Sequence, residues 1–294
     1  MKSTRKVKSP IFVVIILISV FSYIYQTWNS QDNKEEKNYE ENNGRLAVHF
    51  IDVGQADCIL IQFPDEQVSL IDGGNRDDAE NVVEYIEKLG IKKIDYLLAT
   101  HPHEDHIGGL PEVIKQFEIG KIYMPKVSAN TVIFETLLTE IDKKNLKIIS
   151  GKAGINIIDT DDIDFFLLAP NSDKYNETNN YSLLVRLDYR NSSFLFTGDA
   201  EKESEEEIIN QGYNIDVDVL KVGHHGGVSS TSQKFLENVN PFYAVISVGG
   251  NNSYGHPHKE TLERLANMNI KVLRTDEMGT IIMTSDGNTI NIDN

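Results

Sequence analysis

The chain has 294 residues, of which 40% are hydrophobic and 25% are charged, and its formal net charge is −17. This length is enough for one large domain or two small ones with a sizeable buried core. The single cysteine, Cys58, excludes an intramolecular disulfide and a cysteine-rich zinc module. So acidic a chain will not bind nucleic acid through bulk electrostatics, because neutralising phosphates requires Lys and Arg. Metal ions or a local basic patch would have to attract any polyanionic substrate.

The N-terminal 28 residues combine a basic stretch, Met1–Ser9, with an apolar run, Ile11–Tyr25, that ends shortly before Trp28. This pattern is typical of a signal peptide or a short membrane-spanning helix. No small-x-small cleavage site follows it, so we expect an uncleaved signal anchor in the cell membrane with the rest of the chain extracytoplasmic. Cleavage would instead give a secreted protein. Residues 29–45 are rich in Asn, Glu, Lys and Gln and predict a polar linker.

Residues 46–294 show globular patterning without an internal repeat, and we expect them to form one catalytic domain. Alternating apolar residues between turn signals predict the following strands: Leu46–Val53, Cys58–Phe63, Val68–Ile71, Ile94–Ala99, Ile155–Ile158, Asp164–Leu168, Ser182–Leu187, Ser193–Thr197, Val217–Val222, Tyr243–Val248, Lys271–Arg274 and Thr280–Thr284. Helical spacing predicts the following helices: Asp77–Leu89, Gly109–Phe117, Asn130–Leu146, Glu201–Gln211, Ser232–Val239 and Lys259–Met268. Strand-rich pieces followed by β–α alternation favour a layered α/β sandwich with helices outside.

The strongest chemical signal is His101-x-His103-x-Asp105-His106, directly after a predicted strand. Imidazole nitrogens and carboxylate oxygens are good ligands for Zn²⁺ and similar ions. At a strand end His101 and His103 share a face, because alternate side chains point the same way. The Asp105-His106 pair can then address a second ion. A histidine-rich surface loop is the competing interpretation.

This segment, with glycines behind it, resembles the first metal motif of the metallo-β-lactamase superfamily. Further segments resemble its ComEC-like branch, which includes the soluble domain of a competence DNA-uptake channel protein. They are the following: His49–Asp57, Leu70–Gly74, Ser193–Ala200, Asp218–Gly226 and Tyr254–His258. The resemblance covers nearly all of residues 46–294 and implies an αββα sandwich of two mixed sheets flanked by helices.

The resemblance also implies roles in a site for two divalent ions, Zn²⁺ or Mn²⁺. One ion would be bound by His101 and His103, the second by Asp105, His106 and His225, and Asp199 would bridge both.

Three further residues are expected around these ligands. His224 would be the proton donor, although the order of roles within the His224-His225 pair is open, and a pair of polar loop histidines is the alternative. His256 would contact substrate or protonate the leaving group, or be a surface histidine. Asp72 would orient a ligand histidine, or serve only as an Asp-Gly turn residue. Asp199 considered alone could be a helix N-cap.

One departure from the superfamily pattern concerns the third ligand of the first ion. No histidine lies between His106 and His224, whereas the superfamily has one there. Asn179 or Asn180 stands in that region, within an Asn-x-x-Ser pattern of the branch, and we expect Asn180 to be the ligand. An amide oxygen is a harder ligand than imidazole and shifts preference toward Mn²⁺ or Mg²⁺. Val228 and Cys58 also replace small polar residues of the branch.

The functional expectation is an extracytoplasmic metal-dependent hydrolase acting on a phosphodiester or another small anionic substrate. The resemblance favours a nuclease or other phosphodiesterase related to DNA uptake, with single-stranded DNA as a candidate substrate. A cell-wall or choline-phosphate esterase is the second enzymatic alternative. A DNA-uptake accessory protein without catalysis is the third. The sequence does not indicate the oligomeric state.

Overall fold

The computed structural model describes residues 44–293, which form one unit of two facing β-sheets covered by helices. The predicted signal anchor, and the predicted linker up to residue 43, lie outside the described residues. Among the described residues, no helix has the length and apolar character needed to cross a membrane.

The first sheet, sheet A, has eight strands in the order β15-β14-β1-β2-β3-β4-β5-β6. Strands β3 to β6 are parallel to one another, and the other pairs are antiparallel. Its strands are the following: β1 Leu46–Phe50, β2 Ile59–Gln62, β3 Val68–Ile71, β4 Lys93–Leu98, β5 Glu118–Pro125, β6 Ile148–Gly151, β14 Ile281–Ser285 and β15 Ile290–Asp293.

The second sheet, sheet B, has seven strands in the order β13-β12-β11-β10-β9-β8-β7. Strands β10 to β13 are parallel, and β7 to β10 are antiparallel. Its strands are the following: β7 Asn156–Asp159, β8 Ile163–Leu167, β9 Val185–Tyr189, β10 Ser192–Phe196, β11 Val219–Lys221, β12 Tyr243–Ile246 and β13 Lys271–Arg274. Both sheets are mixed, as the resemblance implied.

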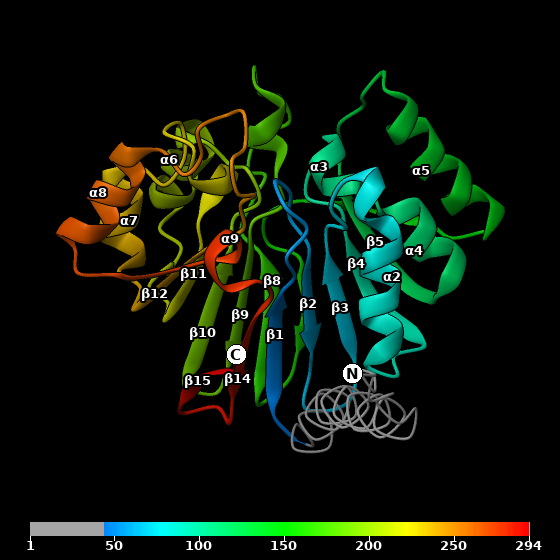
Figure 1. The fold of residues 1–294 in the computed structure, drawn as a ribbon, viewed down its shortest axis with the longest axis horizontal. Helices are drawn as coiled ribbons and strands as arrows, with labels where there is room; N and C mark the ends of the chain where they lie inside the picture. The colour runs from blue at the N-terminus through cyan, green and yellow to red at the C-terminus, as the bar shows by residue number, and fades with distance from the viewer. Residues whose placement is uncertain (1–43, 294) are drawn as a thin grey trace, which may run out of the picture. The chain divides into compact units, whose positions relative to one another are not determined.

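Helices cover the outer face of each sheet (Figure 1). On sheet A lie α2 Ala79–Lys88, α4 Leu110–Gln116 and α5 Val132–Lys143, and on sheet B lie α6 Lys202–Gln211, α7 Gln233–Val239 and α8 Lys259–Asn267. The short helical segments are α3 Glu104–Ile107, α9 Thr275–Met278, η1 Arg76–Asp78, η2 Thr178–Tyr181 and η3 Gly223–Gly226. The predicted αββα sandwich is therefore confirmed.

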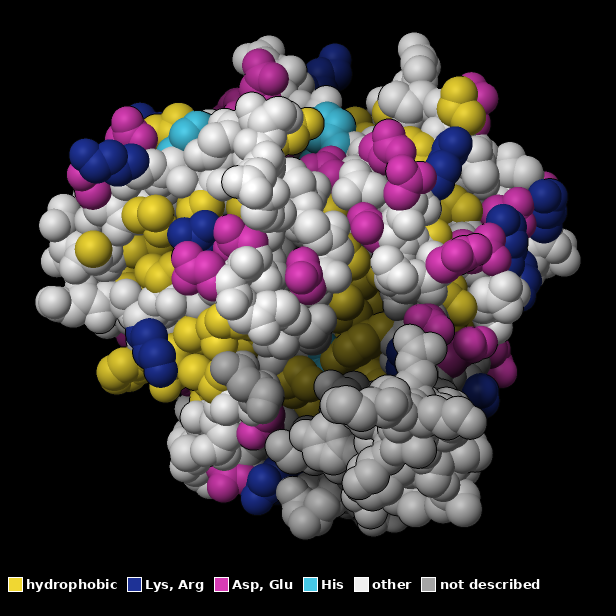
Figure 2. All heavy atoms as spheres, viewed as in Figure 1, with side chains coloured by type: hydrophobic (Ala, Val, Ile, Leu, Met, Phe, Trp, Pro, Cys, Tyr) yellow, Lys and Arg dark blue, Asp and Glu magenta, His cyan; other side chains and the backbone are white. Residues whose placement is uncertain are grey.

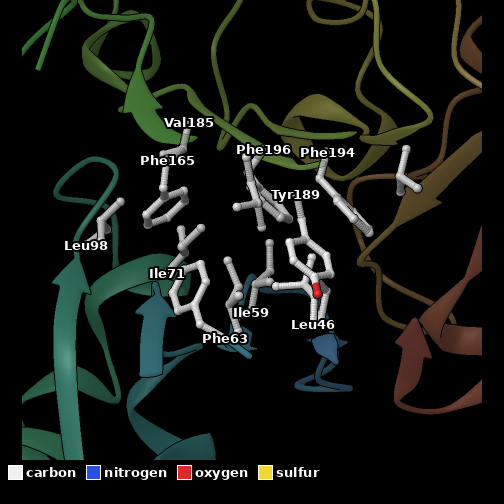
Figure 3. Packing of buried hydrophobic residues seen from close by; sticks show 14 of the residues in the cluster. Leu46, Ile59, Phe63, Ile71, Leu98, Phe165, Val185, Tyr189, Phe194 and Phe196 are labelled. Carbon is white, nitrogen blue, oxygen red and sulfur yellow. The ribbon is translucent and has the colours of Figure 1, made fainter. Parts of the chain in front are cut away.

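Three apolar layers hold the sandwich together. Between the sheets, Phe63 and Ile71 of sheet A pack against Phe165 and Phe196 of sheet B (Figure 3). A second cluster joins sheet A to α2, α4 and α5, and a third joins sheet B to α6, α7 and α8. Each large apolar side chain buried in this way contributes about 1.5–3 kcal/mol. Central strands such as β1 are buried on both faces, which is why they are almost continuously apolar.

Three strands were missed by the sequence prediction, namely β5, β6 and β15. Gly120 and Pro125, both within β5, are residue types that usually interrupt a strand. The structure explains the glycine, because a Cβ at Gly120 would lie 2.5 Å from the backbone oxygen of Asp95 on the neighbouring β4. The glycine thus permits close approach of two parallel strands.

Candidate metal centre

The candidate ligands lie in loops that follow the carboxyl ends of strands from both sheets. The loop after β4 carries His101 to His106, and Asp72 follows β3. From sheet B, Asp199 follows β10 and His225 follows β11. Because parallel strands end at the same edge of a sheet, these segments converge at one end of the sandwich.

Four of the predicted ligands form one compact group: Asp105, His106, Asp199 and His225. Their ligand atoms all lie within 4.8 Å of one another. The Oδ2 of Asp199 lies 3.3 Å from Nε2 of His106 and 3.8 Å from Nε2 of His225. Ligands bound tetrahedrally at about 2.0–2.1 Å stand roughly 3.3 Å apart, so the group has the dimensions of a coordination shell.

Two orphaned polar atoms support this interpretation. The Nε2 of His106 and the Oδ1 of Asp199 are buried and have no hydrogen-bond partner. Buried polar atoms of a native protein are normally satisfied by protein, water or an ion. Nitrogen and carboxylate donors of this kind suit Zn²⁺ and Mn²⁺, so the residues fit a divalent cation.

The electrostatics of the group agree with a site that attracts cations. Burial opposes the charge on His106, but the carboxylates of Asp199 and Asp105 outweigh it and raise its pKa well above the ordinary value. Burial likewise opposes ionisation of Asp199, yet His106 and His225 hold its pKa well below the usual range. The carboxylates therefore stay ionised at neutral pH, and a metal ion held by the group would replace the protons of the two imidazolium rings.

Asp72 lies behind the group. Its Oδ2 is 2.7 Å from Nδ1 of His106 and accepts the Thr100 hydroxyl at 2.7 Å, while Oδ1 accepts the Thr100 backbone N–H at 2.8 Å. A carboxylate on the inner nitrogen of a histidine fixes its ring and points the other nitrogen at the ion. This is the arrangement that the supporting role predicted for Asp72 requires.

A second buried carboxylate, Asp57, lies beside His225, whose Nδ1 donates to the backbone oxygen of Ser247 at 3.0 Å. Oδ1 of Asp57 lies 3.4 Å from Nδ1 of His225, and its Oδ2 forms an ion pair of 2.8 Å with Nζ of Lys221. Burial opposes ionisation of Asp57, but Lys221 and His225 lower its pKa to about 2. Asp57 and Asp72 also approach His106 as a second potential ligand group. Both oxygens of Asp72 are engaged by Thr100 and His106, and Oδ2 of Asp57 by Lys221, whereas Oδ1 of Asp57 has no hydrogen-bond partner.

The backbone at the histidine pair is unusual. His224 and His225 have φ values of 50° and 52°, in the left-handed region that costs non-glycine residues energy. Gly226 follows with φ +83°, and a Cβ there would lie 2.6 Å from Cβ of Pro257. This turn directs both imidazoles toward Asp199, with Nε2 of His224 3.8 Å from its Oδ2.

The predicted first ion site is less complete than the second. Nε2 of His101 lies 3.0 Å from Nδ1 of His103 and 3.9 Å from Oδ2 of Asp199. His101 is buried, whereas His103 is exposed. Within residues 44–293, the two do not belong to a group of three or more His, Cys, Asp or Glu ligands.

The expectation that Asn180 is a ligand needs correction. Its Oδ1 accepts the backbone N–H groups of Glu201 and Ser204, at 3.0 and 3.3 Å, and so caps α6. The buried amide oxygen without a partner belongs instead to Asn179, whose Nδ2 lies 3.5 Å from Nδ1 of His224. Because η2 turns the two adjacent amides in different directions, the sequence alone could not separate them.

The two predicted catalytic histidines differ in their surroundings. The side chain of His224 is 29% exposed, and its Nδ1 faces Oγ of Ser229 at 3.2 Å and Oε1 of Glu201 at 3.6 Å. For His256, burial and the nearby His224 and His225 lower the pKa to about 4. His256 is therefore neutral at pH 7. This favours the substrate-contact alternative over the acid alternative.

The sequence leaves two roles open for Lys221, stabilising developing negative charge or facing solvent. In the structure its side chain is fully buried, and besides Asp57 it donates to the backbone oxygen of Val222 at 2.9 Å. The available signal was its place in an apolar run typical of a buried parallel strand, where a lysine needs a partner.

A hollow of about 700 Å³ adjoins the site and is lined by Glu201, Val228 and Ser229, among others.

Comparisons with known proteins agree with this geometry. The chain is 33% identical over 251 residues to ComE operon protein 3 of Bacillus subtilis (strain 168), covering 80% of this chain and 32% of the relative. It is 30% identical over 237 residues to competence protein ComA of Neisseria gonorrhoeae, again covering 80% of this chain and 32% of the relative. The chain thus spans about a third of the length of these relatives.

Solved structures show the same fold at low identity. CmlA, a diiron β-hydroxylase from Streptomyces venezuelae, aligns with a TM-score of 0.51 at 12% identity, covering 78% of this chain and 52% of that protein. Zn²⁺-bound PqqB from Methylobacterium extorquens aligns with a TM-score of 0.51 at 8% identity, covering 78% and 97%. The family model described as the metallo-beta-lactamase superfamily matches residues 51–250. This chain belongs to the metallo-β-lactamase superfamily and, within it, to the ComEC-like branch of competence proteins.

Proposed function

We propose that this chain is a metal-dependent phosphodiesterase that cleaves nucleic acid, held at the outer side of the cell membrane by its N-terminal segment. The observation that carries the proposal is the compact group Asp105, His106, Asp199 and His225 at the edge shared by both sheets. The family is usually hydrolytic, and the competence relatives support nucleic acid as the substrate. The location rests on the basic and apolar pattern of residues 1–28.

The candidate ligands would form two ion sites. Asp105, His106, Asp199 and His225 would hold one divalent ion, and His101 and His103, with the amide oxygen of Asn179, would hold a second. Bound divalent ions supply Lewis-acid stabilisation of phosphoryl oxygens and activation of water.

The chain's own residues supply orientation and proton transfer. Asp72 and the backbone oxygen of Ser247 hold the rings of His106 and His225 from behind. With Nδ1 of His224 facing Ser229 and Glu201, its Nε2 faces Asp199 and the ligand group. His224 is thus placed to give a proton to the leaving oxygen.

The test combines metal analysis with turnover. The purified full chain is loaded with Zn²⁺ or Mn²⁺, its metal stoichiometry is measured, and hydrolysis of bis(p-nitrophenyl) phosphate and of single-stranded DNA is followed. Asp105→Ala and Asp199→Ala should lose bound metal and all metal-dependent turnover. Asp161→Ala is the matched control. Asp161 is exposed in the turn between β7 and β8, at the end of sheet B opposite the ligand group.

Three outcomes would overturn the proposal. Full activity in Asp105→Ala or Asp199→Ala would refute the metal assignment. Stoichiometric metal binding without turnover of either substrate would instead favour the accessory protein. Hydrolysis of p-nitrophenyl phosphorylcholine with no cleavage of DNA would identify the choline-phosphate esterase.

A further inference from the structure

Exposed apolar side chains mark the rim of the metal centre. Six large hydrophobic residues are exposed in the described part of the chain: Val132, Leu138, Ile148, Val228, Phe242 and Tyr254. Two of them lie within three residues of a site histidine. Tyr254, 67% exposed, precedes His256, and Val228, 52% exposed, follows His225. Figure 2 shows histidine side chains at the upper edge of this face, with hydrophobic atoms beside them.

Tyr254 continues a series of ring contacts that begins at the ligand group. The ring of His256 lies 6.3 Å from that of His225, with an interplanar angle of 27°. The ring of Tyr254 lies 5.7 Å from that of His256, at 25°. Each ring is therefore tilted only modestly against its neighbour, and the outermost, Tyr254, keeps most of its surface open to solvent.

The loop that carries Tyr254 is held in place by hydrogen bonds. The side chain of Asn252 accepts the backbone N–H groups of Tyr254 and His256 and donates to the backbone oxygens of Gly249 and His256. Gln55, from the loop after β1, accepts the N–H of Gly249 and lies 3.3 Å from Nδ1 of His256. The aromatic surface is thus ordered before any ligand binds, which lowers the entropic cost of binding.

We propose that Tyr254, supported by His256, stacks on the nucleobase next to the phosphodiester to be cleaved in a single-stranded nucleic acid. This inference rests on the proposed function. Aromatic side chains bind unpaired bases through their faces, and such stacking is tolerant of sequence. It also requires no positive charge, which suits a chain with a net charge of −17.

The kinetic test compares two esters with the same leaving group. Thymidine 5′-(p-nitrophenyl phosphate) carries a base, and methyl p-nitrophenyl phosphate does not. Tyr254→Ala should lower kcat/KM for the thymidine ester by about tenfold, which corresponds to about 1.4 kcal/mol, because stacking on the base is lost. The methyl ester should change by less than about twofold. Tyr254→Phe and Tyr254→Trp should keep activity on the thymidine ester.

Phe242→Ala provides the matched control. Phe242 is 76% exposed and precedes β12, at the end of that strand remote from the ligand group. Removing the Phe242 side chain should leave kcat/KM unchanged for both esters. An equal loss on both esters in Tyr254→Ala, or no loss on either, would refute the stacking role. If Tyr254→Ala loses turnover of p-nitrophenyl phosphorylcholine but keeps turnover of the thymidine ester, Tyr254 binds a quaternary ammonium group instead of a base.

A binding measurement decides the inference when turnover is absent. The probe is a deoxythymidine oligonucleotide with one 2-aminopurine, whose fluorescence falls on stacking. Wild-type protein should quench it, Tyr254→Ala should bind it about tenfold more weakly, and an abasic oligonucleotide should bind both proteins equally. If neither ester is hydrolysed but the quenching difference persists, the proposed phosphodiesterase fails and the base-binding surface stands. If the esters are hydrolysed but quenching does not differ between wild type and Tyr254→Ala, the base-binding surface fails and the proposed phosphodiesterase stands.

Discussion

Replacing Lys221 by Met should destabilise the protein strongly, and more so at high pH. Nζ of Lys221 lies 2.8 Å from Oδ2 of Asp57, and both side chains are buried. Met fills a similar volume but leaves the carboxylate without its partner. Removing one member of a buried ion pair costs about 3–5 kcal/mol. This is a large share of a folding free energy of about 5–15 kcal/mol.

The pKa of Asp57 gives a separate estimate of the same effect. Burial alone would raise this pKa, but Lys221 and His225 lower it from 3.8 to about 2 in the folded protein. At about 1.4 kcal/mol for each pKa unit, that shift stabilises the fold by roughly 2–3 kcal/mol above pH 4. The contribution is lost as pH falls through 2. In Lys221→Met only His225 and His106 still oppose the effect of burial, so the pKa of Asp57 rises and an ionised Asp57 costs stability at high pH.

The assay is urea unfolding followed by far-UV circular dichroism, in chelator, from pH 5 to pH 8. The stability difference between wild type and Lys221→Met should grow across this range and reach about 3–5 kcal/mol at pH 8. Asp57→Asn in the same chain should recover part of the loss, because the two residues act as a pair. Lys92→Met, at an exposed position, is the control and should stay within about 0.5 kcal/mol. A difference below about 1 kcal/mol at pH 8, or one that does not vary with pH, would refute the reasoning.

Two further predictions concern α6. Asn180→Ala should lower the unfolding free energy by about 1 kcal/mol through loss of the helix cap, with unchanged metal content by elemental analysis; loss of an ion would restore Asn180 as a ligand. Glu205 is buried, and burial raises its pKa to about 7, so the folded protein keeps a proton that the unfolded chain loses above pH 4.5. Stability should therefore fall by about 3 kcal/mol between pH 4.5 and 7 through this group. Glu205→Gln should flatten that part of the urea-derived profile, and an unchanged slope would contradict the assignment.

The ligand-bearing segments could be predicted because their information is local. The spacing of His101, His103, Asp105 and His106 follows from a strand end and one helical turn, and both lie within six residues of sequence. Strand and helix patterns likewise predicted most of the elements and their layered arrangement. The strand β5 was missed because the reason for Gly120 is a neighbour 25 residues earlier, the backbone of Asp95.

Two assignments that depend on partners distant in the chain could not be made from the sequence. The burial of Lys221 depends on Asp57, from the other sheet, and nothing in the local pattern connects them. The choice between Asn179 and Asn180 depends on a 3₁₀ turn and on the start of α6. Which of two adjacent side chains faces a site is a property of the fold, since a change of one residue in register reverses it.

The division of the ligand group between the sheets has a consequence for assembly. Asp105 and His106 come from sheet A, whereas Asp199 and His225 come from sheet B. An ion bound by all four would act as a cross-link between halves that otherwise meet through apolar side chains, which lack directional preference. The ion would thus fix the registration of one sheet on the other, and its binding free energy would add directly to that of folding.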